Sequence, residues 1–565
     1  MKSNRFRPLP SFLLLLPILG WLAAYLCHGI RRPWIDFIDF NGAVWSQSAH
    51  NILRAGLWPT FGAATGFYFG PLPIPASGFY LHHPPLLHLT LACLFAIFGE
   101  HEWVARAVPI ACSLSSIVFL WFLVRSCAGA RTATWGAAVF ALLPMELRYG
   151  RMVNFEPCVL MLILAALLAF RMWCVSGRIA WRRAALTLLC VGLWVDWAMY
   201  LFALTACVIL LAWRNPEGKR LARLILMLAL VSIGCYFLRI RVLRPDAWSN
   251  LMYAFVYRIG SAGGIHFTEA QWLKMIAGNL ARYFLPGGWA LAAVGAWVTW
   301  KTSGEKEGLR WLGLACLAVA GMDAIFIACF QNESYIHDYI PYYLLAPVSI
   351  MAGIAIESTV RMLERRIRRP AFGSAGVAAA LFILIAVGIG GTHEEKVLRR
   401  QFHILALSAS EPPELIPMLG QTIRGDFPKN TVVLCNFLPI YSPELGYYAQ
   451  RDLLNNMTEG RFWIGVAAKE KRPLGGVIWM NCGGAAGIVS HLPSGRRRFM
   501  RIGRDSFCIW SRNTASLPIS KMTSRHRSPI MDSRSRAVLP HHSLISPLPP
   551  LHAFIIPNIP GPGVR

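Results

Sequence analysis

Long apolar runs separated by short polar segments dominate the first 391 residues of the chain. Most of these runs approach or exceed the roughly 20 residues that a helix needs to cross a bilayer. Because a lipid-embedded backbone must satisfy its hydrogen bonds internally, each run predicts a helix. The pattern predicts an all-α polytopic membrane protein with about 11 transmembrane helices. The predicted spans are approximately 11–30, 104–124, 132–147, 157–172, a pair across 184–213, 221–238, 283–300, 311–330, 339–356 and 371–391.

Two of the apolar runs have unusual lengths. The run from 184 to 213 is too long for one helix and carries Asp196 at its middle, so we expect two helices joined there by an external turn. Leu86–Phe98 is apolar but only 13 residues long. That is short for a span, so the segment is predicted to be a re-entrant or interfacial helix.

The Lys and Arg residues indicate how these helices are oriented. With the N-terminus in the cytoplasm, the loops between the predicted spans obey the positive-inside rule. The basic loops are 125–131, 178–183, 214–220, 301–310 and 361–369. Arg239, Arg241 and Arg244 are the exception, because they fall on the outside.

The composition agrees with a membrane protein. Of 565 residues, 55% are hydrophobic and 15% are charged, against roughly 25% charged in soluble proteins, and the mean hydropathy is +0.47. These values exclude a soluble globular enzyme. A net charge of +27 suggests nucleic acid in a soluble chain, but here the basic loops explain it, so no nucleic acid partner is expected. The expected location is a bacterial plasma (inner) membrane.

Segments outside the spans divide the chain. Residues 1–391 are predicted to form the transmembrane domain, with 31–103 as its first external loop. In that loop Val44, Trp45, Ala49 and Ile52 recur at helical spacing, which predicts an amphipathic helix at the membrane surface. Its polar face comprises Ser46, Gln47, His50 and Arg54.

The C-terminal part has a different composition. Residues 392–512 are predicted to form a small external α/β module, with strands at 431–438, 476–482 and 506–510. Residues 513–565 are rich in Ser, Pro, Arg and His and are predicted to be a disordered tail.

Ionisable residues gather on the external side of this topology. Each has an ordinary interpretation: Asp39 as a helix N-cap, His82 and His83 as polar loop residues, and Glu156 as a cap before Pro157. Asp196 is the least ordinary, because a carboxylate between two Trp residues at a membrane boundary is costly without a partner. The set comprises Asp36, Asp39, His82, His83, Glu156, Asp196, His337 and Asp338. Residues from five external segments would converge on one cavity, which indicates a functional site.

Several motifs in the chain resemble those of a known family. They are IDFIDFNG, NILRAGLWPT, YLHHPPLLHL, FGEHEWVARAVP, GRMVNFEP and YIHDYIPYYLLAP. In this order they resemble the polytopic glycosyltransferases of the protein O-mannosyltransferase and aminoarabinose-transferase type, within the GT-C superfamily. The resemblance covers residues 10 to 360.

The resemblance implies transfer of a sugar from a polyprenyl-phosphate donor to a lipid, glycan or protein acceptor on the extracytoplasmic face, with inversion at the anomeric carbon. The family's first-loop acid, the candidate base, matches Asp39, with Asp36 as a competitor. His82 and His83 match the residues before the family's Pro-Pro, Glu156 matches the second-loop acid, and His337 matches a late-loop His.

The chemistry is consistent with this assignment. An in-line displacement needs a base and groups that stabilise the charge on the leaving phosphate, for which Arg148 and Arg151 are candidates. A divalent cation held by Glu156, Asp196 and a His is an open alternative, and the metal ligands stay unknown. Two other functions stay open: a secondary transporter and a non-catalytic membrane assembly protein.

Overall fold

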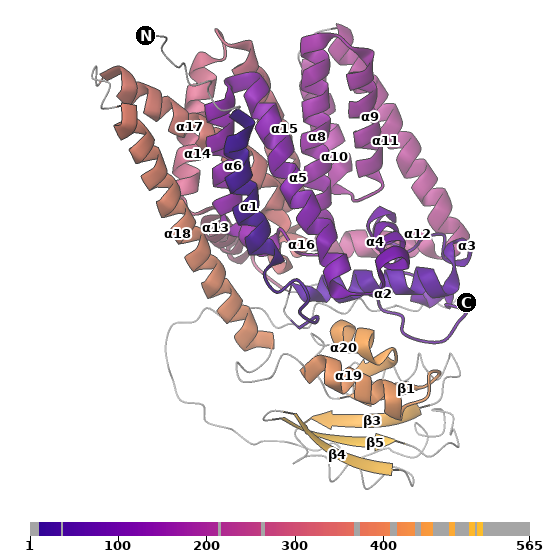
Figure 1. Ribbon diagram of the computed structural model, residues 1–565. Helices are drawn as coiled ribbons and strands as arrows, with labels where there is room; N and C mark the ends of the chain where they lie inside the picture. Colours follow the sequence, from indigo (N-terminus) through magenta and orange to yellow (C-terminus); the bar gives the residue numbers. More distant parts are fainter. Residues whose placement is uncertain are drawn as a thin grey trace. The chain divides into compact units, whose positions relative to one another are not determined.

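The computed structural model describes residues 11–35, 38–212, 216–260, 266–366, 373–406, 415–435, 442–455, 474–480, 496–502 and 505–511. These residues form two compact units. One comprises Met1–Gly66 and Gly78–Leu405, and the other comprises Phe67–Ser77 and Ala406–Arg565. Within these ranges the first unit is helical, and the second combines helices with a sheet (Figure 1).

The long helices of the first unit match the predicted spans. They are α1 (Leu15–Cys27), α5 (Glu102–Ala128), α6 (Ala130–Leu142), α8 (Phe155–Ser176), α9 (Ile179–Leu193), α10 (Ala198–Ala212), α11 (Pro216–Leu243), α14 (Pro286–Thr302), α15 (Glu307–Cys329), α17 (Leu345–Arg366) and α18 (Gly373–Ala406). Among the described residues, six of these helical segments are long and apolar enough to cross a membrane: α5, α8, α11, α15, the segment containing α17, and α18. The prediction of a polytopic all-α membrane fold is confirmed.

The predicted break at Asp196 is present. Helix α9 ends at Leu193 and α10 begins at Ala198. Asp196 is buried in the turn between them, and its Oδ2 accepts a hydrogen bond from the Ala198 amide at 3.3 Å. The carboxylate therefore satisfies a backbone donor at the start of α10, as capping residues do.

Short helices gather at one end of the long helices (Figure 1). They include α2 (Asp39–Ala55), α3 (Leu57–Thr60), α4 (Leu86–Phe98), α12 (Ala247–Arg258), α13 (Glu269–Phe284) and α16 (Gln331–Ile336). Helix α4 packs against α2. At 1.5 Å per residue a helix of this length spans roughly 20 Å, less than the hydrocarbon core of a bilayer. The remaining short segments are α7 (Pro144–Tyr149) and the 3₁₀ helices Ser11–Leu14, Ala76–Gly78 and Ile340–Leu344.

The polar face of α2 corrects one expectation. The predicted helix is present, but of its predicted polar face Ser46 and Gln47 are fully buried, whereas His50 and Arg54 are partly exposed. Ser48 and Asn51 are fully buried as well. The chain after α3 covers this face: the amide of Thr65 donates to Ser48 Oγ at 3.1 Å, and Asn51 Nδ2 donates to the Thr65 carbonyl at 2.9 Å. The hydrophobic spacing identified the helix but not the loop that covers its polar side.

The second unit contains a five-stranded sheet of order β2-β1-β3-β5-β4. Strand β1 is parallel to β2 and β3, and β5 is antiparallel to β3 and β4. Its elements are α19 (Leu415–Asp426), β1 (Val432–Cys435), α20 (Ser442–Ala449), β2 (Asp452–Asn455), β3 (Leu474–Met480), β4 (Arg496–Ile502) and β5 (Asp505–Ser511). The three predicted strands correspond to β1, β3 and β5. The predicted tail, 513–565, lies outside the described residues.

Part of the first external loop belongs to this second unit. The Phe69 amide donates to Asp452 Oδ1 at 2.9 Å, across 383 residues of sequence. The ring of Phe69 also lies against Gly446, where an added Cβ would approach the ring to 2.6 Å. Residues 67–77 therefore form a strap on the C-terminal unit, which we call the first-loop strap. Helix α18 continues past residue 391, and the division of the chain falls after Leu405.

Candidate active site

The loop before α4 is held in place by hydrogen bonds to its backbone. Tyr236 Oη donates to the Leu81 carbonyl, and Trp197 Nε1 donates to the His82 carbonyl, both at 2.6 Å. The Leu86 amide donates to the Trp194 carbonyl at 3.0 Å. These bonds fix the two His residues of the loop against the turn that contains Asp196.

His83 and Asp196 form a direct pair. His83 Nδ1 and Asp196 Oδ1 are 2.9 Å apart, and both side chains are mostly buried. The imidazole also stacks on the ring of Phe155, with centroids 4.6 Å apart. The pairing explains how a carboxylate at this depth is tolerated, since buried charges need partners.

His82 points to a different partner. Its Nε2 lies 2.8 Å from Asn250 Oδ1, while Nδ1 is buried with no hydrogen bond to the described residues. Burial, together with the nearby Arg258, lowers the pKa of His82 well below its usual value. His82 is therefore a neutral imidazole that donates to Asn250.

Arg258, Glu333 and His337 lie in a row next to these residues, with Glu333 between the other two. Arg258 Nε lies 3.2 Å from Glu333 Oε2, and His337 Nε2 lies 3.4 Å from Glu333 Oε1. Arg258 Nη2 also donates to Tyr80 Oη at 3.1 Å. Burial opposes ionisation of Glu333, but Arg258 and His337 outweigh it, so the pKa of Glu333 is lowered. Glu333 is the anionic centre of this row.

Glu156 is the second residue of α8 and is not its cap, a position taken by Asn154. Its Oε2 is buried without a hydrogen-bond partner among the described residues. The carboxylates of Asp196 and Glu333 both disfavour a negative charge on Glu156, because like charges repel. Asn154 Oδ1 accepts from Trp45 Nε1 of α2 at 3.1 Å, which ties this turn to the first external loop. An unpartnered buried carboxylate oxygen is costly, and such groups are commonly retained for function.

The structure thus brings together residues from five segments of the chain. The cluster comprises His83, Glu156, Asp196, Arg258, Glu333 and His337. We call it the carboxylate-histidine cluster. It lies at the end of the first unit where the short helices gather, among the ends of α8 and α12, the α9–α10 turn and α16 (Figure 1).

Asp39 is buried at the first turn of α2 and does not cap it, since Ile38 is the N-cap residue. Asp39 Oδ1 accepts from Arg106 Nη2 at 2.9 Å, and Oδ2 accepts from the Ile35 amide at 3.2 Å. Arg106 also donates to the carbonyls of Ile30, Arg32 and Pro33 and lies over the ring of Trp34. The competitor Asp36 lies outside the described residues.

Asp338 and Arg148 belong to a neighbouring network, and Arg151 lies outside it. Asp338 accepts hydrogen bonds from Tyr149 Oη at 2.6 Å and from Tyr283 Oη. Arg148 Nε donates to Tyr149 Oη at 3.3 Å, whereas Arg151 Nη1 donates to the His28 carbonyl at 2.8 Å. Tyr339 connects this network with the cluster, because its ring contacts both Tyr149 and His337.

Sequence reasoning missed two members of the cluster. Glu333 precedes His337 by four residues on adjoining turns, and this spacing was a usable signal. No spacing pointed to Arg258. The three cations predicted to lie outside also have partners: Arg239 donates to the Phe61 carbonyl, Arg241 to the Pro245 carbonyl and Arg244 to Asp246.

The metal hypothesis gains no support from the geometry. Over the described ranges, no group of three or more His, Cys, Asp or Glu side chains is arranged to hold a metal ion. Asp196, one of the expected ligands, is paired with His83 instead.

A dependence of stability on pH follows from the buried imidazoles. Burial lowers the pKa of both His82 and His337 in the folded protein. In the unfolded chain the pKa of His is about 6.5. Below that pH the unfolded chain binds more protons, so stability is full above about pH 6.5 and falls as the pH decreases. We expect the thermal unfolding midpoint in detergent to decrease when the pH is lowered from 7.5 to about 5.5. The variant His82→Gln should show a smaller decrease. His101→Gln, at an exposed position, is the matched control; equal pH profiles for all three proteins would contradict the prediction.

Comparison with known proteins places this fold in a class. Residues 82–238, which contain His82, His83, Glu156 and Asp196, match the family model described as dolichyl-phosphate-mannose-protein mannosyltransferase. The fold is that of the GT-C membrane glycosyltransferases, so the resemblance read from the motifs is confirmed. No curated protein matches the chain by sequence.

Two solved structures illustrate the similarity. ArnT from Cupriavidus metallidurans bound to undecaprenyl phosphate is 13% identical, over 88% of this chain and 98% of the ArnT chain, with a TM-score of 0.57. The archaeal oligosaccharyltransferase AglB from Archaeoglobus fulgidus, in complex with an inhibitory peptide and a dolichol-phosphate, is 13% identical over 82% of this chain and 69% of its own, with a TM-score of 0.54. At this identity the matches show a shared fold.

Proposed function

We propose that the protein is a membrane glycosyltransferase that moves a sugar from a polyprenyl-phosphate donor to an acceptor on the extracytoplasmic face, with inversion at the anomeric carbon. The observation that carries the proposal is the carboxylate-histidine cluster at one end of a GT-C fold. Glu156, with its unpartnered oxygen, is the member best placed to receive a substrate group.

The donor class is supported by what similar proteins bind. ArnT was solved with undecaprenyl phosphate and AglB with a dolichol-phosphate, both polyprenyl-type phosphates. AglB also holds a peptide, whereas the acceptor of this protein can be a lipid, a glycan or a protein. The basic loops lie at the ends of the helices away from the cluster, which supports an extracytoplasmic site in a bacterial plasma membrane.

The reaction assigns a role to each group. The acceptor hydroxyl attacks C1 of the sugar, the bond from C1 to the phosphate oxygen breaks, and the hydroxyl proton passes to a base. Asp39 is the proposed base, and the Arg106 and Ile35 contacts set the direction of its carboxylate. Glu156 would hold the acceptor or the sugar near it.

The leaving phosphate requires cations. Arg148, Arg151 and Arg258 are the candidates from the described residues. Arg148 binds Tyr149 beside Asp338 and Arg258 binds Glu333, whereas Arg151 binds the His28 carbonyl. A guanidinium suits a phosphate because it can donate two parallel hydrogen bonds. His83, oriented by Asp196, and His82, oriented by Asn250, would bind sugar hydroxyls.

A transfer assay tests the proposal. The protein, reconstituted with an envelope extract as acceptor source, is expected to move label from a radiolabelled polyprenyl-phosphate sugar into a new product while polyprenyl phosphate is released. The variant Asp196→Asn, which weakens the orientation of His83, should lower the rate. Glu364→Gln, at the other end of the helices, serves as the control. Uptake of free sugar without consumption of the donor would indicate a transporter instead.

A further inference from the structure

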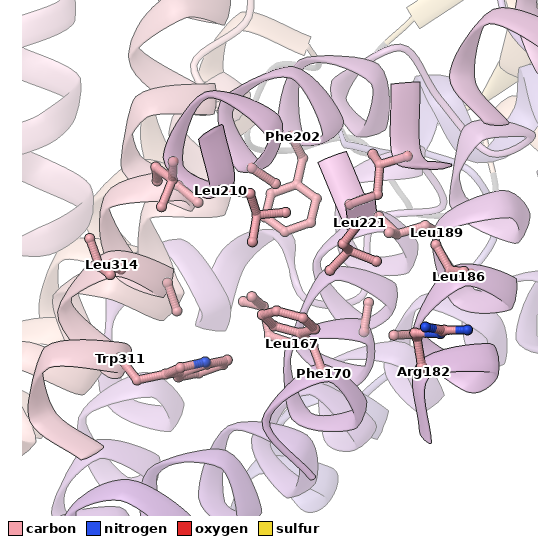
Figure 2. A pocket seen from close by; sticks show the side chains of 17 residues that line it. Leu167, Phe170, Arg182, Leu186, Leu189, Phe202, Leu210, Leu221, Trp311 and Leu314 are labelled. Carbon is pink, nitrogen blue, oxygen red and sulfur yellow. The ribbon is translucent and has the colours of Figure 1, made fainter. Parts of the chain in front are cut away.

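A second feature lies among the long helices, away from the candidate site. Helices α8, α9, α10, α11 and α15 line a small, partly open apolar cavity of about 80 Å³. Figure 2 shows its side chains pointing inward, with Phe202 and Leu210 on one side and Trp311 and Phe170 on another. Sixteen of the 17 lining residues are Ala, Leu, Ile, Phe or Trp, and the other is Arg182. At about 80 Å³ the cavity is too small to enclose a whole small molecule, but because it is partly open between the helices, a slender apolar chain can lie along it.

Small residues create this space. Five alanines line the cavity: Ala166, Ala185, Ala206, Ala315 and Ala318. Protein interiors are normally closely packed, and an unfilled hollow between helices loses the dispersion contacts of its lining. Apolar walls offer water no hydrogen-bond partners, so an apolar molecule is the appropriate occupant.

The cavity continues to the ends of the helices. A second hollow shares Phe170, Leu210, Leu221 and Trp311 with it and extends to Gly177. Gly177 follows α8, whose first turn carries Glu156 at the opposite end. At 1.5 Å per residue, α8 separates the two ends by roughly 30 Å. The opening is therefore on the side of the basic loops, remote from the candidate active site.

The opening carries positive charge. Arg182 lines the cavity and lies over the ring of Trp173, 5.7 Å from its centroid. Exposed basic residues flank it near the N-terminal ends of α9 and α11: Arg178, Arg183, Lys219, Arg220 and Arg223. Two carboxylates, Glu217 and Glu307, also line the second hollow. The excess of cations beside an apolar cavity complements a molecule with an apolar chain and an anionic head group.

We infer that this cavity binds one acyl chain of an anionic glycerophospholipid of the cytoplasmic leaflet, with the lipid phosphate at Arg182. The proposed sugar donor is a less suitable occupant, because its phosphate has to reach the carboxylate-histidine cluster at the other end of α8; this one step rests on the proposed function. The acyl chain would complete the packing of the five helices. The lipid would then act as a structural component of the helical unit.

Photocrosslinking in vesicles tests the inference. The full-length protein is reconstituted in phosphatidylcholine containing a minor fraction of phosphatidylglycerol with a diazirine in its acyl chain, and crosslinks are mapped by mass spectrometry. They are expected on lining residues of α8, α10 and α15. Ala206→Phe fills the cavity and should reduce these crosslinks about ten-fold, equivalent to about 1.4 kcal/mol of binding free energy. Leu204→Phe, exposed on the same helix, should not.

The head group is tested separately. Arg182→Gln should reduce crosslinking by phosphatidylglycerol more than Arg183→Gln, its exposed neighbour outside the cavity, while crosslinking by a phosphatidylcholine probe should change little. Equal crosslinking in Ala206→Phe and wild type would overturn the inference. So would efficient displacement of the lipid probe by a polyprenyl phosphate. Neither result depends on the transfer assay, so failure of the proposed activity leaves this test intact.

Discussion

Replacement of Asp39 by Asn is expected to lower the rate of sugar transfer roughly 100- to 10,000-fold, the range contributed by a general base. The amide cannot take the proton of the acceptor hydroxyl. The same change weakens the ion pair with Arg106, in which Oδ1 and Nη2 are 2.9 Å apart. Breaking a buried pair destabilises a protein by about 3–5 kcal/mol. The rate must therefore be measured per folded molecule, with the unfolding midpoint determined in parallel.

Arg106→Gln is the matched control for Asp39→Asn. It breaks the same ion pair from the other side and leaves the carboxylate in place. If Asp39 is the base, the Arg106 variant should retain far more activity per folded molecule than the Asp39 variant. Equal losses would show that Asp39 serves only to anchor Arg106 and the chain from Ile30 to Pro33, and the role of base would move to Asp36 or Glu156.

Replacement of Glu156 by Gln is expected to combine a large loss of activity with little loss of stability. The rate should fall roughly 100- to 1,000-fold, as when one transition-state contact is removed. Stability should be unchanged or higher, because Oε2 has no partner among the described residues and a buried acid beside the carboxylates of Asp196 and Glu333 is replaced by a neutral group of similar shape. The measurements are the transfer rate and the thermal unfolding midpoint.

Glu357→Gln gives the opposite pattern and is the control. Glu357 is a buried carboxylate that binds Arg131 at 3.2 Å and Arg361 at 2.6 Å. Its loss should lower stability and leave the rate per folded molecule unchanged. In addition, the Asp39→Asn, Glu156→Gln double variant should be scarcely slower than the slower single variant, because groups that act as a unit are non-additive. Rate losses that multiply would separate the two residues.

The elements that the sequence predicts well are those with long, simple patterns. The length of each apolar run was enough to locate the long helices, and a single carboxylate, Asp196, located the break between α9 and α10. Strands β2 and β4 were missed for different reasons. Asp452–Asn455 is only four residues long, and Arg496–Ile502 contains four arginines, which a hydrophobic pattern does not identify as a strand.

The site was less accessible to sequence reasoning, because its contacts join distant parts of the chain. His83 and Asp196 are 113 residues apart, and both were candidates, but nothing in the sequence indicated that they pair. Arg258 resembles any other cation of an external segment until Glu333 and Tyr80 are seen beside it. Motifs identify residue types, whereas pairing depends on how helices from several loops meet.

The first-loop strap has a consequence for biosynthesis. Its anchor, the hydrogen bond from Phe69 to Asp452, joins residues 383 positions apart. At about 5–20 residues per second, ribosomes need roughly 20–80 s to synthesise the intervening chain. Throughout that interval the strap lacks its partner Asp452, and exposed loops are preferred sites of proteolytic cleavage. Docking of the strap therefore requires that synthesis of the chain has passed Asp452, so the first external loop cannot take its complete form before the C-terminal unit is made.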